Sequence, residues 1–183
     1  MAKVINYAGK LIDPLNLTKE DFQNCGMQSA VTLSRICRFW SQTQEFYSVA
    51  QHCLSMVELF DDIDLKKAAI AHEVYEALTG MDVPSPIKHS LAYKPYRQAE
   101  DEALLLFGEI YNIDMSKKSI ITQIKEADNG LKIMEALALM PHNPELNWLE
   151  QGDPVGKLYK LGAPQEEIKK DYLLMWTKLF GKL

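Results

Sequence analysis

Residues 69–78 read AIAHEVYEAL and place His72, Glu73 and Glu76 inside an apolar stretch with the character of a helix. His72 and Glu76 lie four residues apart and share one helix face, whereas Glu73 points about a quarter-turn away. Burying ionisable groups is costly unless they are paired or bound to a metal ion. The stretch therefore indicates either a helix with a solvent-exposed edge or a helix whose polar side chains bind a ligand.

Helical patterns continue on both sides of this stretch and predict an all-α fold. Near the N-terminus, the segment KVINYAGKLIDPL has short stretches with β-branched residues on both sides of Gly9. This pattern favours a short β-hairpin. Apolar residues then recur at the three- and four-residue spacing of buried helix faces. The spacing predicts helices over residues 27–38, 49–60, 65–79, 95–111, 117–140 and 165–180.

Boundary residues mark the ends of several of these helices. Ser48 with Gln51 three residues later forms a capping-box signal, and Asp64 and Ser116 are each expected to cap the helix that follows. The two prolines in MDVPSPIK, residues 81–88, predict non-helical backbone there.

Length, charge and cysteine content bound the class of protein. The chain has 183 residues with 47% hydrophobic content, which suits a single domain over residues 1–183. Its net charge of −5 argues against binding to nucleic-acid polymers or anionic membranes. The sequence lacks both an apolar run of the roughly 20 residues that span a bilayer and the features of a signal peptide, so we expect a cytoplasmic protein. Its three cysteines show no CxxC spacing, which indicates reduced thiols packed as small apolar residues.

Imidazole and carboxylate groups recur on three of the predicted helices. His52 lies in YSVAQH, His72 and Glu73 lie in the opening stretch, and Asp128 lies in IKEADNGL. If these helices converge, the side chains form a mixed nitrogen and oxygen ligand set that suits a divalent transition ion. The zincin motif HExxH does not fit, because Glu76 stands where that motif has its second histidine.

Three segments together resemble the HD-domain metal-dependent phosphohydrolases, in particular the compact nucleotide hydrolases of bacteria and bacteriophages. The segments are CRFWSQTQEFYSVAQH, AHEVYEALTGMDVPSPIK and IKEAD, and their order and spacing also match. The resemblance covers about residues 9–139, which it marks as the core of a helical HD-domain bundle. The irregular segment 141–163 and the last predicted helix have no counterpart in it.

The resemblance implies a metal centre and a proton-transfer group. It carries the ligands of a divalent cation (Co²⁺, Mn²⁺, Zn²⁺ or Mg²⁺) onto His52, His72, Glu73 and Asp128. It carries the acidic residue that activates water or protonates the leaving group onto Glu76, so that Glu76 and Glu73 form the expected catalytic pair.

The resemblance also implies a substrate and an assembly. The expected substrate is a deoxynucleotide, either a 5′-monophosphate or a triphosphate such as dATP. The expected assembly is a homo-oligomer. Its expected location is the cytoplasm, which is the host cytoplasm if a phage encodes the chain. Residues expected to contact the nucleotide are Arg38, Trp40, Asp82, Lys88 and Lys125.

Several of these residues also have a purely structural interpretation. Arg38 suits the C-terminus of the preceding helix, where cations are favoured, Trp40 suits a core position, and Lys88 and Lys125 suit a solvated surface. The amphipathic last helix is expected to pack on its own domain, with a subunit interface as the alternative.

The sequence departs from the family at the metal doublet, which is His-Glu here instead of His-Asp. Glutamate still offers carboxylate oxygens, but its stem is one methylene longer. The departure leaves an alternative function open, a non-catalytic nucleotide-binding or regulatory protein with a degenerate HD site.

Overall fold

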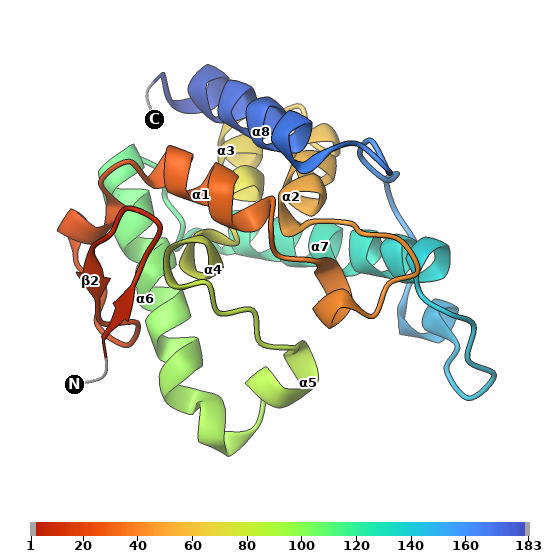
Figure 1. The fold of residues 1–183 in the computed structure, drawn as a ribbon. Coiled ribbons are helices and arrows are strands. Elements are labelled where there is room, and N and C mark those ends of the chain that lie inside the picture. Colours follow the sequence, from red (N-terminus) through yellow and green to blue (C-terminus); the bar gives the residue numbers. More distant parts are fainter. Residues whose placement is uncertain (1–2, 182–183) are drawn as a thin grey trace.

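The computed structural model describes residues 3–181, and Figure 1 shows a mostly helical chain with one small hairpin at its N-terminal edge. Strand β1 (Val4–Ile5) pairs antiparallel with β2 (Leu11–Ile12), and Gly9 adopts a φ of +75° between them, a value that glycine reaches without strain. The predicted all-α class and hairpin are both confirmed. Residues 1, 2, 182 and 183 of the predicted domain lie outside the described residues.

The helices follow in chain order and are joined by loops and short 3-10 turns. The α-helices are α1 (Cys25–Leu33), α2 (Val49–Glu58), α3 (Ile63–Ala71), α4 (Val74–Thr79), α5 (Ser85–Lys88), α6 (Lys94–Tyr111), α7 (Lys118–Leu139) and α8 (Gln165–Phe180). The 3-10 turns are η1 (Lys19–Phe22), η2 (Arg38–Ser41), η3 (Leu91–Tyr93) and η4 (Trp148–Gln151).

Capping explains where some helices begin. The capping box at α2 is confirmed, because the Ser48 hydroxyl accepts a hydrogen bond from the Gln51 backbone N–H at 3.2 Å and Gln51 Oε1 accepts one from the Ser48 N–H at 2.9 Å. The predicted Asp64 cap is wrong. Asp62 caps α3 instead, since its carboxylate reaches two free N–H groups of the first turn. Ser116 does not cap α7 either, because its hydroxyl donates to Asp114.

Two further predictions, the end of α1 and the non-helical backbone of residues 81–88, are also wrong. Helix α1 ends at Leu33 rather than at residue 38, because the chain beyond it pairs with the segment before α2. The Arg38 N–H donates to the Tyr47 carbonyl at 2.8 Å, and the Val49 N–H donates to the Ile36 carbonyl at 2.9 Å. The proline-containing segment does form one helical turn, α5, since its second proline lies in the first turn, where no N–H is needed.

Helix α8 closes the core over the N-terminal half of the chain. It packs on α1, α2 and α3, and is the blue helix at the top of Figure 1. Trp176 of α8 lies so close to α1 that a Cβ on Gly26 would lie 2.4 Å from its indole nitrogen, so only glycine fits there. The predicted packing of this helix on its own domain is confirmed by its four buried side chains, Ile168, Tyr172, Trp176 and Leu179.

A candidate metal centre and its cavity

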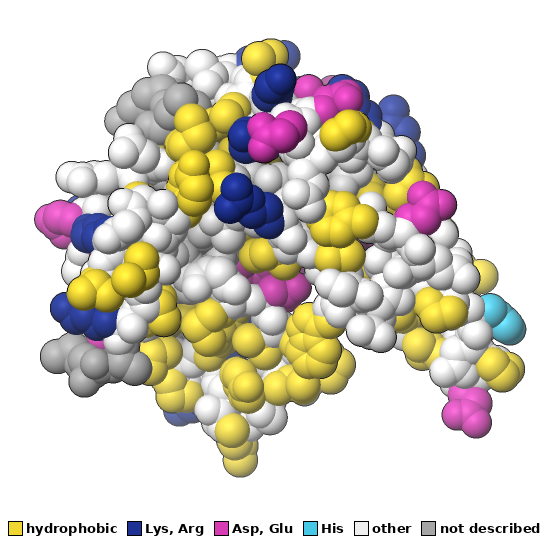
Figure 2. Space-filling model, in the orientation of Figure 1, with side chains coloured by type: hydrophobic (Ala, Val, Ile, Leu, Met, Phe, Trp, Pro, Cys, Tyr) yellow, Lys and Arg dark blue, Asp and Glu magenta, His cyan; other side chains and the backbone are white. Residues whose placement is uncertain are grey.

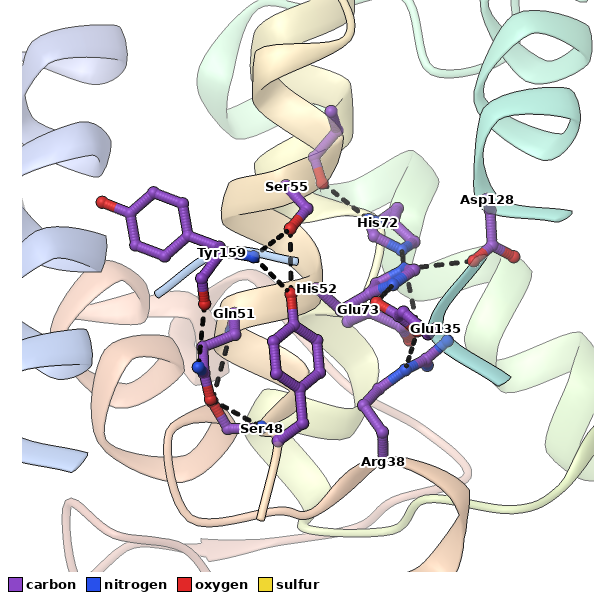
Figure 3. A network of polar contacts seen from close by, with 12 residues as sticks. Arg38, Ser48, Gln51, His52, Ser55, His72, Glu73, Asp128, Glu135 and Tyr159 are labelled. Carbon is purple, nitrogen blue, oxygen red and sulfur yellow. Dashed lines mark hydrogen bonds and ion pairs between the residues drawn. The ribbon is translucent and has the colours of Figure 1, made fainter. Parts of the chain in front are cut away.

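Three helices bring two imidazoles and a carboxylate to one point, as Figure 3 shows. His52 comes from α2, His72 from the end of α3 and Asp128 from α7, and one ligand atom of each lies within 4.8 Å of the others. His52 Nε2 lies 3.2 Å from His72 Nε2 and 3.1 Å from Asp128 Oδ1. The expected convergence of these three residues is therefore confirmed.

A break between α3 and α4 shapes one side of this centre. His72 Nδ1 lies 2.6 Å from the Ala69 carbonyl, which in a continuous helix would accept the N–H of Glu73. The single helix predicted over residues 65–79 is wrong for this reason. Because the chain turns at Glu73, its Oε1 comes within 3.4 Å of His72 Nε2, and two adjacent residues face the same point.

The hydrogen bonds of the two histidines aim their Nε2 atoms at the centre. His52 Nδ1 lies 2.8 Å from a carboxylate oxygen of Glu135, and His72 Nδ1 faces a backbone carbonyl. An acceptor at Nδ1 assigns the proton to that nitrogen and leaves Nε2 as a metal ligand. In the neutral rings, the two Nε2 atoms face each other at 3.2 Å with their lone pairs. These lone pairs repel each other unless a proton or a cation lies between them. This set of two imidazole nitrogens and a carboxylate oxygen could therefore hold a metal ion.

The charges around the centre also favour a cation. Burial and the nearby Arg38 oppose a proton on His52, but Glu135 and Asp128 outweigh them and raise the pKa of His52 to about 9. Partial burial opposes ionisation of Asp128, yet its contacts with His52 hold its pKa below the ordinary value. Partial burial likewise opposes ionisation of Glu73, but its interaction with His72 holds its pKa below the ordinary value. The centre therefore presents ionised carboxylates at neutral pH.

A cavity of about 650 Å³ opens beside the centre, within the range of roughly 300–1,000 Å³ typical of small-molecule sites. Figure 2 shows this face hollowed between the α5 region and the chain that follows α7, with acidic atoms at the inner end of the hollow. Of the residues predicted from the sequence, the cavity lining includes Arg38, Trp40, Glu73, Glu76, Asp82, Lys88 and Asp128.

The buried Glu76 and the partly buried Lys88 lie close together in the cavity wall. Glu76 is only 4% exposed, and burial together with the Glu73 and Asp82 carboxylates raises its pKa well above the ordinary value. Lys88 Nζ lies 3.7 Å from Glu76 Oε1 and 2.7 Å from Glu100 Oε1. Glu76 is therefore a carboxyl group whose surroundings favour its protonated form, beside the Lys88 ammonium group.

The structure also distinguishes between the alternative interpretations of the other predicted residues. Arg38 pairs with a carboxylate on α7 and does not cap α1. Trp40 is 47% exposed, so it is no core residue, and its indole N–H donates to the Asp82 carbonyl at 3.2 Å. Lys125 is exposed and does not belong to the cavity lining, so the structure does not bring it to the site.

Sequence reasoning missed several residues of the site. Glu135 is fully buried and contacts both His52 and Arg38. Its signal in the sequence was an acidic residue two helical turns after Asp128, on the same face of an apolar helix. Three further residues of the lining had no local signal, namely Lys132, Trp148 and Gln151.

Comparison with known proteins adds one relative. No family model matches the chain. The chain is 33% identical over 99 residues to the "Uncharacterized protein YfdR" of Escherichia coli strain K12. The match covers 54% of this chain and 52% of that protein, so the chain spans about half the length of the curated relative it matches. Within residues 3–181, no helix has both the length and the apolar character that a bilayer crossing requires.

Proposed function

We propose that this chain is a metal-dependent phosphohydrolase of deoxynucleotides, acting on a 5′-monophosphate or on a triphosphate such as dATP. One observation carries the proposal. The Nε2 atoms of His52 and His72 face each other at 3.2 Å, with an Asp128 oxygen 3.1 Å from the first of them, at the edge of a cavity that also holds cationic side chains.

His52, His72 and Asp128 would hold the divalent cation, with Glu73 beside them as the fourth ligand. Bound there, the cation would polarise a phosphoryl oxygen and lower the pKa of a water molecule. The water oxygen forms the new bond to phosphorus, and the bond from phosphorus to the 5′-oxygen of the nucleoside breaks. Glu76 would give a proton to this leaving oxygen and recover one from the attacking water, which balances the step, and its raised pKa favours the form that carries the proton.

Cationic side chains in the cavity would hold the phosphate. The hydrogen bond between Arg38 and Glu135 uses Arg38 Nε, which leaves the two terminal nitrogens of its guanidinium to pair with phosphate oxygens. Lys88 and Lys132 also line the cavity and provide further positive charge.

Aromatic side chains would provide the surface for the sugar and base. Trp40, Phe39 and Trp148 all line the cavity, and the rings of Phe39 and Trp148 pack edge to face with their centroids 6.1 Å apart. Flat apolar rings suit a nucleoside, since every base can stack on them.

The direct test is an assay of purified protein with Co²⁺ or Mn²⁺ and a panel of deoxynucleoside mono- and triphosphates. We expect cation-dependent formation of nucleoside together with either phosphate or inorganic triphosphate, and the anion that forms identifies the substrate class. Measurable nucleotide binding without any product, whichever cation is added, contradicts the proposal.

A second candidate, a nucleotide-binding protein without catalysis, is favoured by one observation. Glu73 lies outside the set of three residues whose ligand atoms fall within 4.8 Å of one another, although its oxygen is 3.4 Å from His72 Nε2. The Glu73→Asp variant separates the two candidates. If the native site is active, we expect the turnover rate of Glu73→Asp to stay within about tenfold of wild type, or about 1.4 kcal/mol in barrier height. A much larger gain in rate favours the non-catalytic candidate.

A further inference from the structure

We propose that Glu135 is a positioning residue that sets the cation ligand His52 and the phosphate-binding Arg38 at the same time, and so couples cation binding to phosphate binding. The inference rests on the proposed function for the role of Arg38, while its cation-binding half stands on the metal centre alone. Glu135 touches neither the cavity nor the cation ligand atoms, so it acts through its two partners.

Both oxygens of the Glu135 carboxylate are committed. Oε1 accepts from His52 Nδ1 at 2.8 Å, and Oε2 accepts from Arg38 Nε at 2.9 Å, as the centre of Figure 3 shows. The carboxylate is fully buried, on a helix whose neighbouring side chains are largely apolar. Such a buried charge is tolerated only where it is paired and hydrogen-bonded. Here the His52 ring and the Arg38 guanidinium provide both its charge partner and its hydrogen bonds.

Each hydrogen bond has a consequence for the cavity. The bond to His52 holds the proton on Nδ1, orients the ring and leaves Nε2 directed at His72 and Asp128. The bond to Arg38 ties Nε of the guanidinium and fixes the plane in which its terminal nitrogens meet a ligand. A movement of Glu135 therefore changes both the cation site and the phosphate site.

An amide cannot replace this carboxylate, because it has one acceptor oxygen instead of two. In Glu135→Gln, the amide oxygen can serve His52, which leaves the amide N–H₂ against the N–H of Arg38. It can otherwise serve Arg38, and the N–H₂ then faces His52 Nδ1 and moves the proton of the ring to Nε2. Either arrangement disturbs one of the two sites without a change in side-chain size.

The test measures Mn²⁺ affinity by calorimetry, without substrate. We expect Glu135→Gln to bind Mn²⁺ roughly 10- to 100-fold more weakly, as for other carboxylates that support metal-bound histidines. Glu135→Asp keeps two acceptor oxygens and should lose less affinity. The matched control is Glu102→Gln, which removes the charge of an exposed glutamate on α6. This variant should bind Mn²⁺ like wild type. Unchanged Mn²⁺ affinity in Glu135→Gln overturns the inference, even if its melting temperature falls.

A second measurement uses the wild-type protein, so it stands even if the variants do not fold. The chain has four histidines, and ¹⁵N NMR of their rings in the presence of Zn²⁺ reports which nitrogen carries the proton. We expect His52 to be protonated at Nδ1 and bound through Nε2. Binding through Nδ1, or the absence of any cation binding by wild type, overturns the inference.

These outcomes are distinguishable from failure of the proposed function. A wild-type protein that binds Mn²⁺ but hydrolyses no nucleotide contradicts the phosphohydrolase and leaves the effect of Glu135→Gln on Mn²⁺ affinity intact. If the protein is active, Glu135→Gln should also raise KM for the nucleotide, a second change that a loss of stability alone does not produce.

Discussion

Replacing Asp128 by alanine is expected to abolish cation-dependent nucleotide hydrolysis while the protein remains folded. Asp128 supplies the one carboxylate oxygen of the three-residue centre, 3.1 Å from His52 Nε2. Its side chain is 41% exposed, so its removal opens no cavity in the core. The residual rate should be at least about 1,000-fold below wild type, or roughly 4 kcal/mol in barrier height, because no cation is left to polarise the phosphoryl group.

The measurement is product formation with Mn²⁺, accompanied by calorimetry for Mn²⁺ and by the melting temperature in the presence of EDTA. Asp101→Ala, an exposed aspartate on α6, is the matched control and should keep both activity and Mn²⁺ binding. If Asp128→Ala retains wild-type Mn²⁺ affinity and wild-type turnover, the metal centre is not the catalytic centre.

Replacing Glu76 by glutamine is expected to lower turnover by roughly 100- to 10,000-fold, the usual contribution of a general acid or base, without weakening Mn²⁺ binding. Glutamine keeps the size of the side chain but cannot give up a proton to the leaving oxygen. Because burial and the neighbouring carboxylates raise the pKa of Glu76, its protonated form persists to higher pH than in an ordinary glutamate and is lost as the pH rises further. Wild-type activity should therefore fall on the alkaline side, and this fall should be absent from the residual activity of Glu76→Gln.

The control for Glu76 is Glu100→Gln. Glu100 also pairs with Lys88, at 2.7 Å, but it does not belong to the cavity lining. Its replacement should alter KM through the position of Lys88 and keep the alkaline fall in turnover, moved towards lower pH because the Glu100 carboxylate contributes to the raised pKa of Glu76. Equal losses of turnover in the two variants would assign the effect to Lys88 rather than to proton transfer by Glu76.

The features that the sequence predicted well are those set by local chemistry. Ser48 and Gln51 form their capping box within four residues, and the repeating apolar residues of α6, α7 and α8 place these helices within one or two residues of the predicted ranges. His52, His72 and Asp128 stand out because ionisable groups rarely occupy apolar helix faces without a ligand or partner.

The missed features depend on contacts between distant segments. The break at Glu73 follows from the direction of the His72 ring, which the pattern of apolar residues does not encode. Trp148 reaches the cavity because the chain after α7 folds back along that helix, where the Asn129 side chain donates to the Gln151 carbonyl. Glu135 gains its two partners only because α2 and η2, distant in the sequence, pack beside α7.

Helix α7 fixes the spacing between the metal ligand candidate Asp128 and the supporting carboxylate Glu135. Asp128 and Glu135 stand seven residues apart on one uninterrupted helix, close to two full turns. One residue added or removed between them would turn one relative to the other by about 100° and shift it by about 1.5 Å along the axis. Substitutions at the outward positions of this interval would therefore leave the two carboxylates in register, whereas an insertion or deletion would separate them.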